Sequence, residues 1–483
     1  MRQLKYILSG LTILLIVACS TDDDSINNPD QELDQFIWNG MNQAYLYKAD
    51  VPELANDKFS NTSELNKFLA TFPSPEELYS NLQSEQDRFS FITDNYIELE
   101  QAFSGVSKSN GMDFSLALVK KGSNDVIGFV RYVLPGTDAE AKGIVRGDIF
   151  NRINGEKLTR STDFNSLLNL NTYTIGLATI TSDGTIVTSG EEVSLTQTEY
   201  TENPIFINKV IEYQGQRVGY IMYNSFVSNF DEQLNTAFGE LKAQGINDLI
   251  LDLRYNGGGS VQTAIDLSAM ITGQFTGEIF SKEIWNNELQ NAFNNEDPEQ
   301  LLNRFRDTIR TGAQINSLNL SKVYILTTDR SASASELVIN GLDPYIETIK
   351  IGDTTTGKFQ ASITLYDSNN FGRSGASTAH TYAIQPLVLK SANKLGKTDF
   401  INGLVPNVNF QETISDLGVL GEATEPFLNA ALEYVVNRII PADPNAKNKK
   451  SFFQEMKVLG ESKMYNPTYQ RMYIDPNKID LIR

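Results

Sequence analysis

The chain has 483 residues, 40% of them hydrophobic and 10% aromatic, so it is long enough for several domains with buried cores and is not disordered as a whole. Its 60 acidic and 40 basic residues give a formal net charge of -20, which repels phosphate backbones and argues against nucleic acid as a partner. A single cysteine and a single histidine exclude an intrachain disulfide, a thiolate metal site and a two-histidine zinc helix.

The first residues have the order of a secretory signal. Arg2 and Lys5 precede an apolar run at 6–17 that is too short to span a bilayer comfortably, and Cys19 follows two residues later. This end of the run resembles the bacterial lipobox, in which the cysteine is lipidated. The alternative is an ordinary signal peptide with an incidental cysteine. Because Cys19 is the sole cysteine of the chain, we expect residues 1–18 to be a lipoprotein signal peptide.

Lipidation of Cys19 would anchor the protein to a membrane without a transmembrane helix. The expected location is therefore the cell envelope, on the periplasmic or the surface-exposed face of the outer membrane. Residues 19–32 would form an acidic tether, and its three aspartates at 22–24 resemble the export signal of surface lipoproteins in the Bacteroidetes.

Residues 33–104 have apolar side chains mostly at helical spacing, which predicts a small helical N-terminal domain. The pattern changes at 105–200, where a loop at Gly111 runs into an apolar strand. Further on stand the sequence LPGTDAEAKGIVRGD at 134–148 and an Asn-Gly turn at 154–155. This order of turn, short helix, Gly-Asp turn and strand resembles a PDZ domain. A generic β-rich spacer is the alternative.

A PDZ resemblance implies that this domain captures extended peptide ends by adding a strand to the edge of its sheet. The segment of Gly111, Met112, Asp113 and Phe114 resembles the loop whose backbone amides receive a terminal carboxylate in such domains.

Strands and helices alternate over residues 205–440. Buried strands are predicted at 217–223, 249–253 and 323–327, and helices at 230–243, 259–271 and 333–342. This alternation predicts βαβ units around a mostly parallel sheet, with sites in the loops beyond the carboxyl ends of the strands. The stretch 285–314 lacks strong periodicity and is either a lid or an insertion, and residues 441–483 are left as a C-terminal extension.

One loop of this core is rich in glycine and runs from Asp252 to Gly259, with the sequence DLRYNGGG. Consecutive glycines let the backbone approach a ligand and turn its N–H groups toward it. The loop is either half of an oxyanion hole or a tight turn.

A second loop, SASASE at 331–336, joins a strand to a helix. Ser333 at such a junction can be an exposed nucleophile, with the next amide completing an oxyanion hole. Ser333 with Glu336 three residues later also fits a helix capping box, and the two roles are compatible.

Lys358 follows Gly357 after a further strand. A lysine can act as a base toward serine only when it is neutral, and burial in an apolar cleft lowers its pKa toward the working pH. Considered alone, a lysine after a glycine is typical of a surface residue.

Together these motifs resemble the carboxyl-terminal-processing or tail-specific proteases, the S41 serine peptidases, which pair a PDZ domain with a Ser-Lys dyad. The resemblance covers residues 87–410 and makes Ser333 the nucleophile and Lys358, 25 positions later, the base. It places the backbone amides of Gly258 and Ala334 at the oxyanion hole. Where the family often has an orienting glutamine this chain has Ser362, with Gln360 nearby, so either could orient the lysine.

The resemblance implies a multidomain α/β fold: a crotonase- or ClpP-like βαβ protease core, an inserted PDZ domain and the helical N-terminal domain. It implies an endopeptidase that acts on protein or peptide substrates and needs no metal and no organic cofactor. His380 is interpreted as structural. The alternatives are a catalytically inactive surface lipoprotein that binds peptides or small ligands, and an esterase that uses the same dyad.

Overall fold

The computed structural model describes residues 29–120, 122–181, 185–439, 458–475 and 481. The predicted signal peptide, Cys19 and nearly all of the predicted acidic tether lie outside the described residues. None of the described helices is long and apolar enough to cross a membrane.

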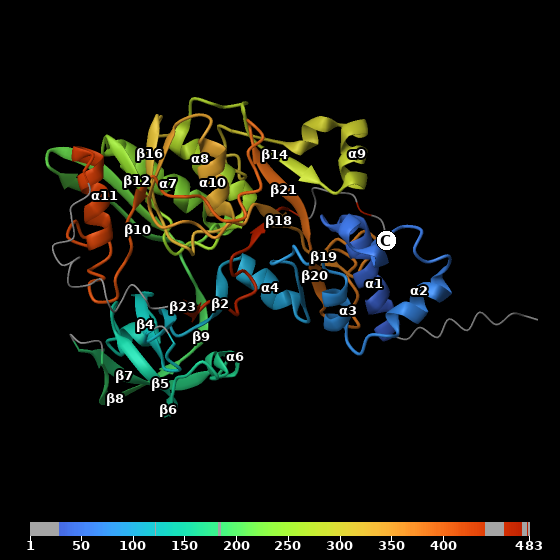
Figure 1. Cartoon of the computed structure of the whole chain (residues 1–483). Helices are drawn as coiled ribbons and strands as arrows, with labels where there is room; N and C mark the ends of the chain where they lie inside the picture. Colours follow the sequence, from blue (N-terminus) through green and yellow to red (C-terminus); the bar gives the residue numbers. More distant parts are fainter. Residues whose placement is uncertain (1–28, 121, 182–184, 440–457, 476–480, 482–483) are drawn as a thin grey trace, which may run out of the picture.

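The N-terminal part is mainly helical, as expected, and contains α1 (Pro29–Ala44), α2 (Thr62–Leu69), α3 (Pro75–Asn81) and α4 (Tyr96–Phe103). The side chains of Asn61, Ser74 and Asn95 cap the last three of these helices by accepting backbone N–H groups. The short strand β1 (Phe91–Thr93) pairs with β20 (Ala383–Gln385), so this part is tied to the rest of the chain. Figure 1 shows α1, α2 and α3 at one end of the molecule and α4 nearer its middle.

The next part is a β domain. Its sheet has the order β23-β3-β4-β5-β7-β8, with the two-residue strand β6 (Glu156–Lys157) paired to β5. The long strands are β3 (Met112–Leu118), β4 (Val126–Val133), β5 (Ile149–Ile153), β7 (Thr172–Ile180) and β8 (Ile186–Thr196). The short helices α5 (Asp138–Ala141) and α6 (Phe164–Leu168) complete it, and its apolar residues form a separate core.

The α/β core has a six-stranded sheet in the order β10-β11-β12-β16-β17-β22. All neighbouring pairs are parallel except β10 (Ile205–Tyr213) with β11 (Gln216–Tyr223). The remaining strands are β12 (Asp248–Asp252), β16 (Lys322–Thr327), β17 (Glu347–Gly352) and β22 (Val408–Asn409). This arrangement agrees with the predicted alternation of strands and helices.

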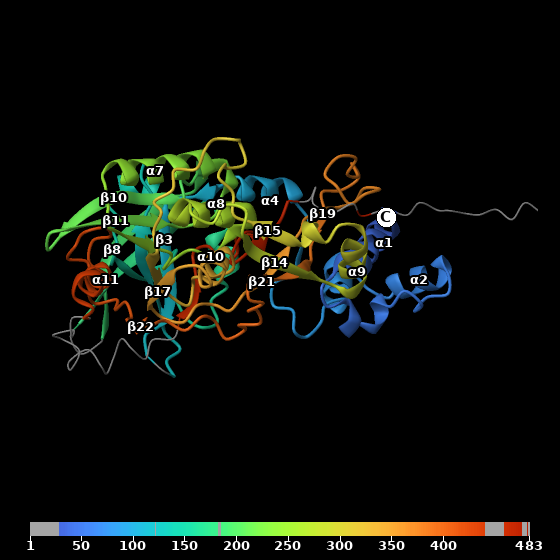
Figure 2. The same cartoon turned by 90° about the horizontal axis from the view of Figure 1, so that it is seen from above.

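Helices cover both faces of this sheet, and successive side chains of a strand pack against helices on opposite faces. Ile221 and Tyr223 of β11 pack with α7 (Asp231–Ala243), α8 (Val261–Thr272) and α10 (Ala334–Leu342). Tyr220 and Met222 of the same strand pack on the other side with α11 (Pro426–Asn437). Figure 2 shows α7 and α8 together on one side and α11 on the other.

A second sheet of six strands lies beside the first, in the order β13-β24-β18-β21-β14-β15. It contains β13 (Gly259–Ser260), β18 (Gln360–Ser362), β21 (Leu387–Asn393), β14 (Ile279–Trp285) and β15 (Leu302–Arg304). The stretch 285–314, which has no strong periodicity in sequence, contains α9 (Asn287–Glu296) and contacts the N-terminal helices through an ion pair of 2.8 Å between Glu288 and Lys48.

The C-terminal residues belong to two of these sheets, which the sequence did not predict. The strand β23 (Val458–Glu461) joins the β domain, and β24 (Met472–Tyr473) lies between β13 and β18. The red trace in Figure 1 runs between these two positions. We call residues 458–475 the C-terminal segment.

Candidate active site

Three adjacent parallel strands bring the predicted site together. The glycine loop follows β12, Ser333 follows β16 and Lys358 follows β17, and these strands are neighbours in the sheet. Because the carboxyl ends of parallel strands lie at one edge, loops distant in sequence meet there.

Ser333 is fully buried and immediately precedes α10. Its backbone has φ of +61° and ψ of -114°, a conformation that residues other than glycine rarely adopt. Such strained residues persist where the surrounding structure fixes them, and they are typical of functional sites.

The Glu336 carboxylate fixes the backbone of both predicted catalytic residues. Its Oε2 accepts the N–H of Ser333 at 2.9 Å, as a capping box requires, and the N–H of Lys358 at 2.8 Å. Its Oε1 accepts the Gly357 N–H at 2.7 Å and the Thr355 hydroxyl at 2.5 Å. Burial raises the pKa of Glu336, and these four donors oppose that effect. The capping residue therefore also joins the two loops.

Lys358 is fully buried, unlike a typical lysine after a glycine. Its Nζ donates to the backbone oxygen of Gln470 at 3.0 Å and lies 4.6 Å from the centroid of the Phe89 ring. Burial lowers its pKa well below the ordinary value, and the nearby positive charge of Arg471 lowers it further, while Asp87 acts in the opposite direction. A neutral amine is what a lysine base requires.

Ser333 and Lys358 share one acceptor. Ser333 Oγ donates to the same Gln470 oxygen at 3.3 Å. The hydroxyl and the amine therefore face one point in the cleft, which the C-terminal segment occupies.

The predicted oxyanion hole is only partly in place. A Cβ on Gly258 would lie 3.0 Å from the Ala334 nitrogen and 2.5 Å from Ser333 Cβ, so the glycine loop closely approaches the start of α10. The Gly258 N–H, however, donates to Asn256 Oδ1 at 2.8 Å. The buried Asn256 is itself held by a bond from its side-chain nitrogen to the Tyr223 oxygen. In this conformation the Gly258 amide is therefore engaged within its own loop, and its role toward a substrate stays a prediction.

The two candidates for orienting the lysine bind other partners in this structure. Ser362 Oγ donates to the Met472 oxygen at 3.2 Å, and Gln360 donates to the Tyr47 hydroxyl at 2.8 Å. Within the described ranges neither side chain hydrogen bonds to Lys358. Ser362 lies at the junction of β18 with β24, and this pairing directs its hydroxyl toward the C-terminal segment.

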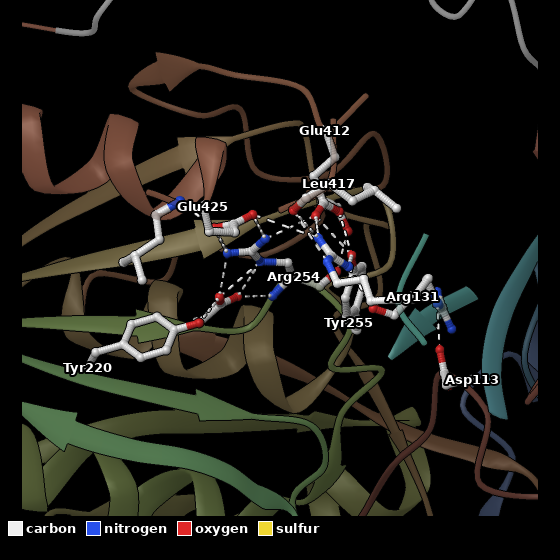
Figure 3. Close-up of polar contacts among 12 residues, drawn as sticks. Asp113, Arg131, Tyr220, Arg254, Tyr255, Glu412, Leu417 and Glu425 are labelled. Atoms are coloured by element: carbon white, nitrogen blue, oxygen red, sulfur yellow. Dashed lines mark hydrogen bonds and ion pairs between the residues drawn. The ribbon is translucent and has the colours of Figure 1, made fainter. Parts of the chain in front are cut away.

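The first residues of the glycine loop belong to a buried ion network, which Figure 3 shows. The Arg254 guanidinium binds Asp252 at 2.7 Å, Glu425 at 2.8 Å and Glu412 at 2.9 Å. Arg146 of the β domain also binds Glu412 at 2.7 Å. Although burial opposes it, Arg146 and Arg254 lower the pKa of Glu412 to about 2. The network fixes the base of the glycine loop against the β domain.

The β domain edge predicted to bind peptides is occupied by the chain itself. Strand β23 pairs antiparallel with β3, with Glu461 opposite Ser115, and the Ser462 N–H donates to the Phe114 oxygen at 2.9 Å. The Gly111 and Met112 amides donate to the side chains of Ser109 and Asn110. Asp113 is buried and paired with Arg131 at 2.6 Å. The loop amides of Gly111 and Met112 are thus already used within the domain.

A cavity of about 820 Å³ connects this edge to the glycine loop. Its lining includes Gly111, Phe114, Gly257, Gly258 and the C-terminal residues 461–471. The cavity is of the size of a ligand site. The C-terminal segment forms part of its wall.

Other candidate residues lie outside this arrangement. His380 Nε2 is 3.0 Å from Asp367 Oδ2, and its Nδ1 accepts the Tyr382 N–H, which agrees with a structural role. In the part of the chain that the structure describes, no group of three or more His, Cys, Asp and Glu side chains is arranged to hold a metal ion.

Comparisons with known proteins identify the class to which this fold and site belong. The model of peptidase family S41 matches residues 217–406, and that of the peptidase S41 N-terminal domain matches residues 32–91. The chain belongs to peptidase family S41.

Individual relatives are distant. A carboxyl-terminal-processing protease from Picosynechococcus is 24% identical over 303 residues, which is 62% of this chain and 64% of that protein. A protein of the same description from Synechocystis is 26% identical over 168 residues, covering 35% of this chain and 34% of that one. The chain thus aligns with less than two thirds of the length of these curated relatives. A crystal structure described as an S41 protease from Bacteroides fragilis is 25% identical, with a TM-score of 0.64, over 84% of this chain and 97% of that one.

Proposed function

We propose that the protein is a serine endopeptidase that cleaves proteins or peptides with Ser333 as nucleophile and Lys358 as base. The observation that carries the proposal is the convergence of the Ser333 hydroxyl and the buried Lys358 amine on one oxygen. Membership of family S41 supports a peptidase of the serine type.

The reaction follows from these groups. Neutral Lys358 accepts the proton of Ser333 Oγ, and the oxygen attacks the carbonyl carbon of the scissile bond. The Ala334 amide, next to the nucleophile, would stabilise the negative charge that develops on the carbonyl oxygen. The proton then passes from Lys358 to the leaving nitrogen as the C–N bond breaks, and water hydrolyses the resulting ester and restores the hydroxyl.

The engaged Gly258 amide gives this proposal a structural condition. For two donors to stabilise the oxyanion, the Gly258 N–H has to leave Asn256 Oδ1. We propose that a substrate carbonyl bound beside Ala334 accepts the Gly258 N–H in place of Asn256 Oδ1. The arrangement with the Gly258 N–H on Asn256 Oδ1 would then be the less active one.

We propose that the β domain is a PDZ domain that captures extended peptides on the edge of β3. Support comes from β23, which already pairs with this edge as an added strand. The proposed lipidation of Cys19 would hold the enzyme at a membrane of the cell envelope. Metabolic labelling with a palmitate analogue, compared between wild type and Cys19→Ala, tests the anchor.

The direct test is digestion of casein, an unfolded protein, by wild type and by Ser333→Ala and Lys358→Ala variants. We expect cleavage by wild type and a loss of at least about 100-fold in both variants. Cleavage that survives Ser333→Ala contradicts the proposed nucleophile. The matched control is Ser335→Ala, two positions along the same loop. It removes a hydroxyl that donates to the Asn256 backbone oxygen.

A second candidate function is a peptide receptor without catalysis. Two observations favour it: the Gly258 amide is engaged with Asn256, and no side chain among the described residues hydrogen bonds to the Lys358 amine. Absence of casein and ester hydrolysis by wild type, with peptide binding intact, would establish this alternative. Ester turnover without peptide cleavage would indicate an esterase.

A further inference from the structure

The C-terminal segment follows a path that a substrate would be expected to use. At its start β23 extends the β3 edge of the β domain, and Glu461 there is buried against Arg131 and Arg330. At its end β24 pairs in parallel with β13 and with β18, with Met472 opposite Gly259 and Tyr473 opposite Ser362. Strand addition at a sheet edge is a general mode of peptide recognition.

Between β23 and β24 the backbone of the segment contacts the side chains of Ser333 and Lys358. The Gln470 oxygen accepts from both Ser333 and Lys358. A Cβ on Gly257 would lie 3.1 Å from the Gln470 nitrogen, and one on Gly258 would lie 2.6 Å from the Arg471 oxygen. The glycines are therefore needed for this backbone to fit, which is the role expected of them toward a substrate.

The side chain of Arg471 enters a pocket made by the N-terminal domain. Its guanidinium carbon lies 4.4 Å from the centroid of the Phe91 ring, and its Nη1 donates to the Phe89 oxygen. The charge of Asp87 acts favourably on it, while burial lowers its pKa to about 10. The Arg471 Nε is buried and has no hydrogen-bond partner. The pocket therefore complements the positive charge of this side chain but does not satisfy all of its N–H donors.

An aromatic face, a carbonyl oxygen and a nearby carboxylate together favour a cation. A neutral side chain of the same length would lose the attraction to the Phe91 ring and to Asp87, although it would avoid the cost of burying a charge. A lysine would keep the charge but lose the planar donor group.

We propose that the C-terminal segment is a peptide ligand bound in cis, and that the pocket around Arg471 is a subsite that selects an arginine or lysine of a substrate. This inference rests on the proposed function, because it names the substrate class of the same cleft. It implies that the segment competes with substrates, since a tethered ligand acts at a high effective concentration.

The test uses full-length protein and a fluorescent peptide with the sequence of residues 466–475, NPTYQRMYID. Its binding is measured by anisotropy to a Ser333→Ala/Arg471→Ala protein, in which turnover is prevented and the pocket is vacated. Peptides with lysine or glutamine in place of the arginine are compared. We expect the arginine peptide to bind at least about 10-fold more tightly than the glutamine peptide, with the lysine peptide between them.

Competition is measured with the Ser333→Ala protein that keeps Arg471. We expect it to bind the arginine peptide at least about 10-fold more weakly than the double variant does. Ser333→Ala/Arg304→Ala is the matched control, because Arg304 forms an exposed pair with Glu299. Thermal unfolding of each protein verifies folding, and Ser333→Ala/Arg471→Gln provides a second vacated pocket.

Equal binding of the three peptides, equal binding to the two proteins, or binding to neither overturns the inference. Because no step of this test needs hydrolysis, its outcome is independent of the casein experiment. Casein cleavage together with equal binding of the three peptides would refute the subsite and leave the peptidase proposal standing. Selective peptide binding without casein cleavage would refute the peptidase proposal and leave the subsite standing.

Discussion

The side chains of Ser333 and Lys358 donate to the same backbone oxygen, that of Gln470, at 3.3 Å and 3.0 Å. The two residues come from different strand-to-loop junctions of one parallel sheet, and the Glu336 carboxylate accepts the backbone N–H of both.

Replacing Glu336 with glutamine should separate the two loops. The amide has one oxygen where the carboxylate offers two, so at least one of its four donors loses its acceptor in a buried place. We expect about 1–3 kcal/mol less stability in urea denaturation and a fall in kcat of at least about 10-fold. Glu347→Gln, at an exposed position of β17, is the matched control. Unchanged kcat in a folded Glu336→Gln protein would contradict this role.

Adding one methyl group at Gly258 should close the cleft. The residue has φ of +110°, and a Cβ there would lie 2.5 Å from Ser333 Cβ. We expect Gly258→Ala to reduce kcat/KM by at least about 100-fold. Gly277→Ala separates backbone strain from the clash, because Gly277 has φ of +87° and nothing within 4 Å of the added atom. If both variants lose equal activity, the contact with Ser333 is not the cause.

The pH profile of cleavage should report the amine of Lys358. Only the neutral amine accepts the serine proton, so activity rises as pH passes upward through the Lys358 pKa, which burial and Arg471 hold well below its usual 10.5. Arg471→Gln removes a nearby positive charge, and we expect the rising limb of kcat/KM, which reports the free enzyme with the C-terminal segment in place, to move to higher pH. Arg304→Gln should leave the limb in place. A shift of the rising limb to lower pH in Arg471→Gln would contradict this prediction.

Arg254 is expected to support the glycine loop through the ion network. Arg254→Met leaves the carboxylates of Asp252 and Glu425 buried without their cation. We expect a loss of about 3–5 kcal/mol in the free energy of unfolding, measured by urea denaturation. Arg304→Met, which breaks an exposed pair, should cost less than about 1 kcal/mol. A loss of similar size in the two variants would show that the buried network is not stabilising the core.

Much of the core could be predicted because its signals are local. The strands at 217–223, 249–253 and 323–327 are short apolar runs, and the loops after them carry the serine and glycine motifs. The structure has β11, β12 and β16 there, within one residue at each end. The shared position of Ser333 and Lys358 follows from the parallel order of these strands.

What could not be predicted depends on pairing between distant segments. The strands β23 and β24 have four and two residues, too few for a periodic signal, and their partners lie hundreds of positions earlier. The bond from the Ser362 hydroxyl to the Met472 oxygen has the same origin, because it depends on the pairing of β18 with β24. The Gly258 amide is engaged by a neighbour, Asn256, whose side-chain direction no sequence pattern specifies.

The most direct test of the account is active-site labelling with a peptidyl phosphonate, which forms a covalent bond to an activated serine. The account predicts a single adduct, located on Ser333 by mass spectrometry, and a labelling rate at least about 100-fold lower in Lys358→Met. An adduct on a different serine, or a Ser333 labelling rate that Lys358→Met leaves unchanged, would contradict it.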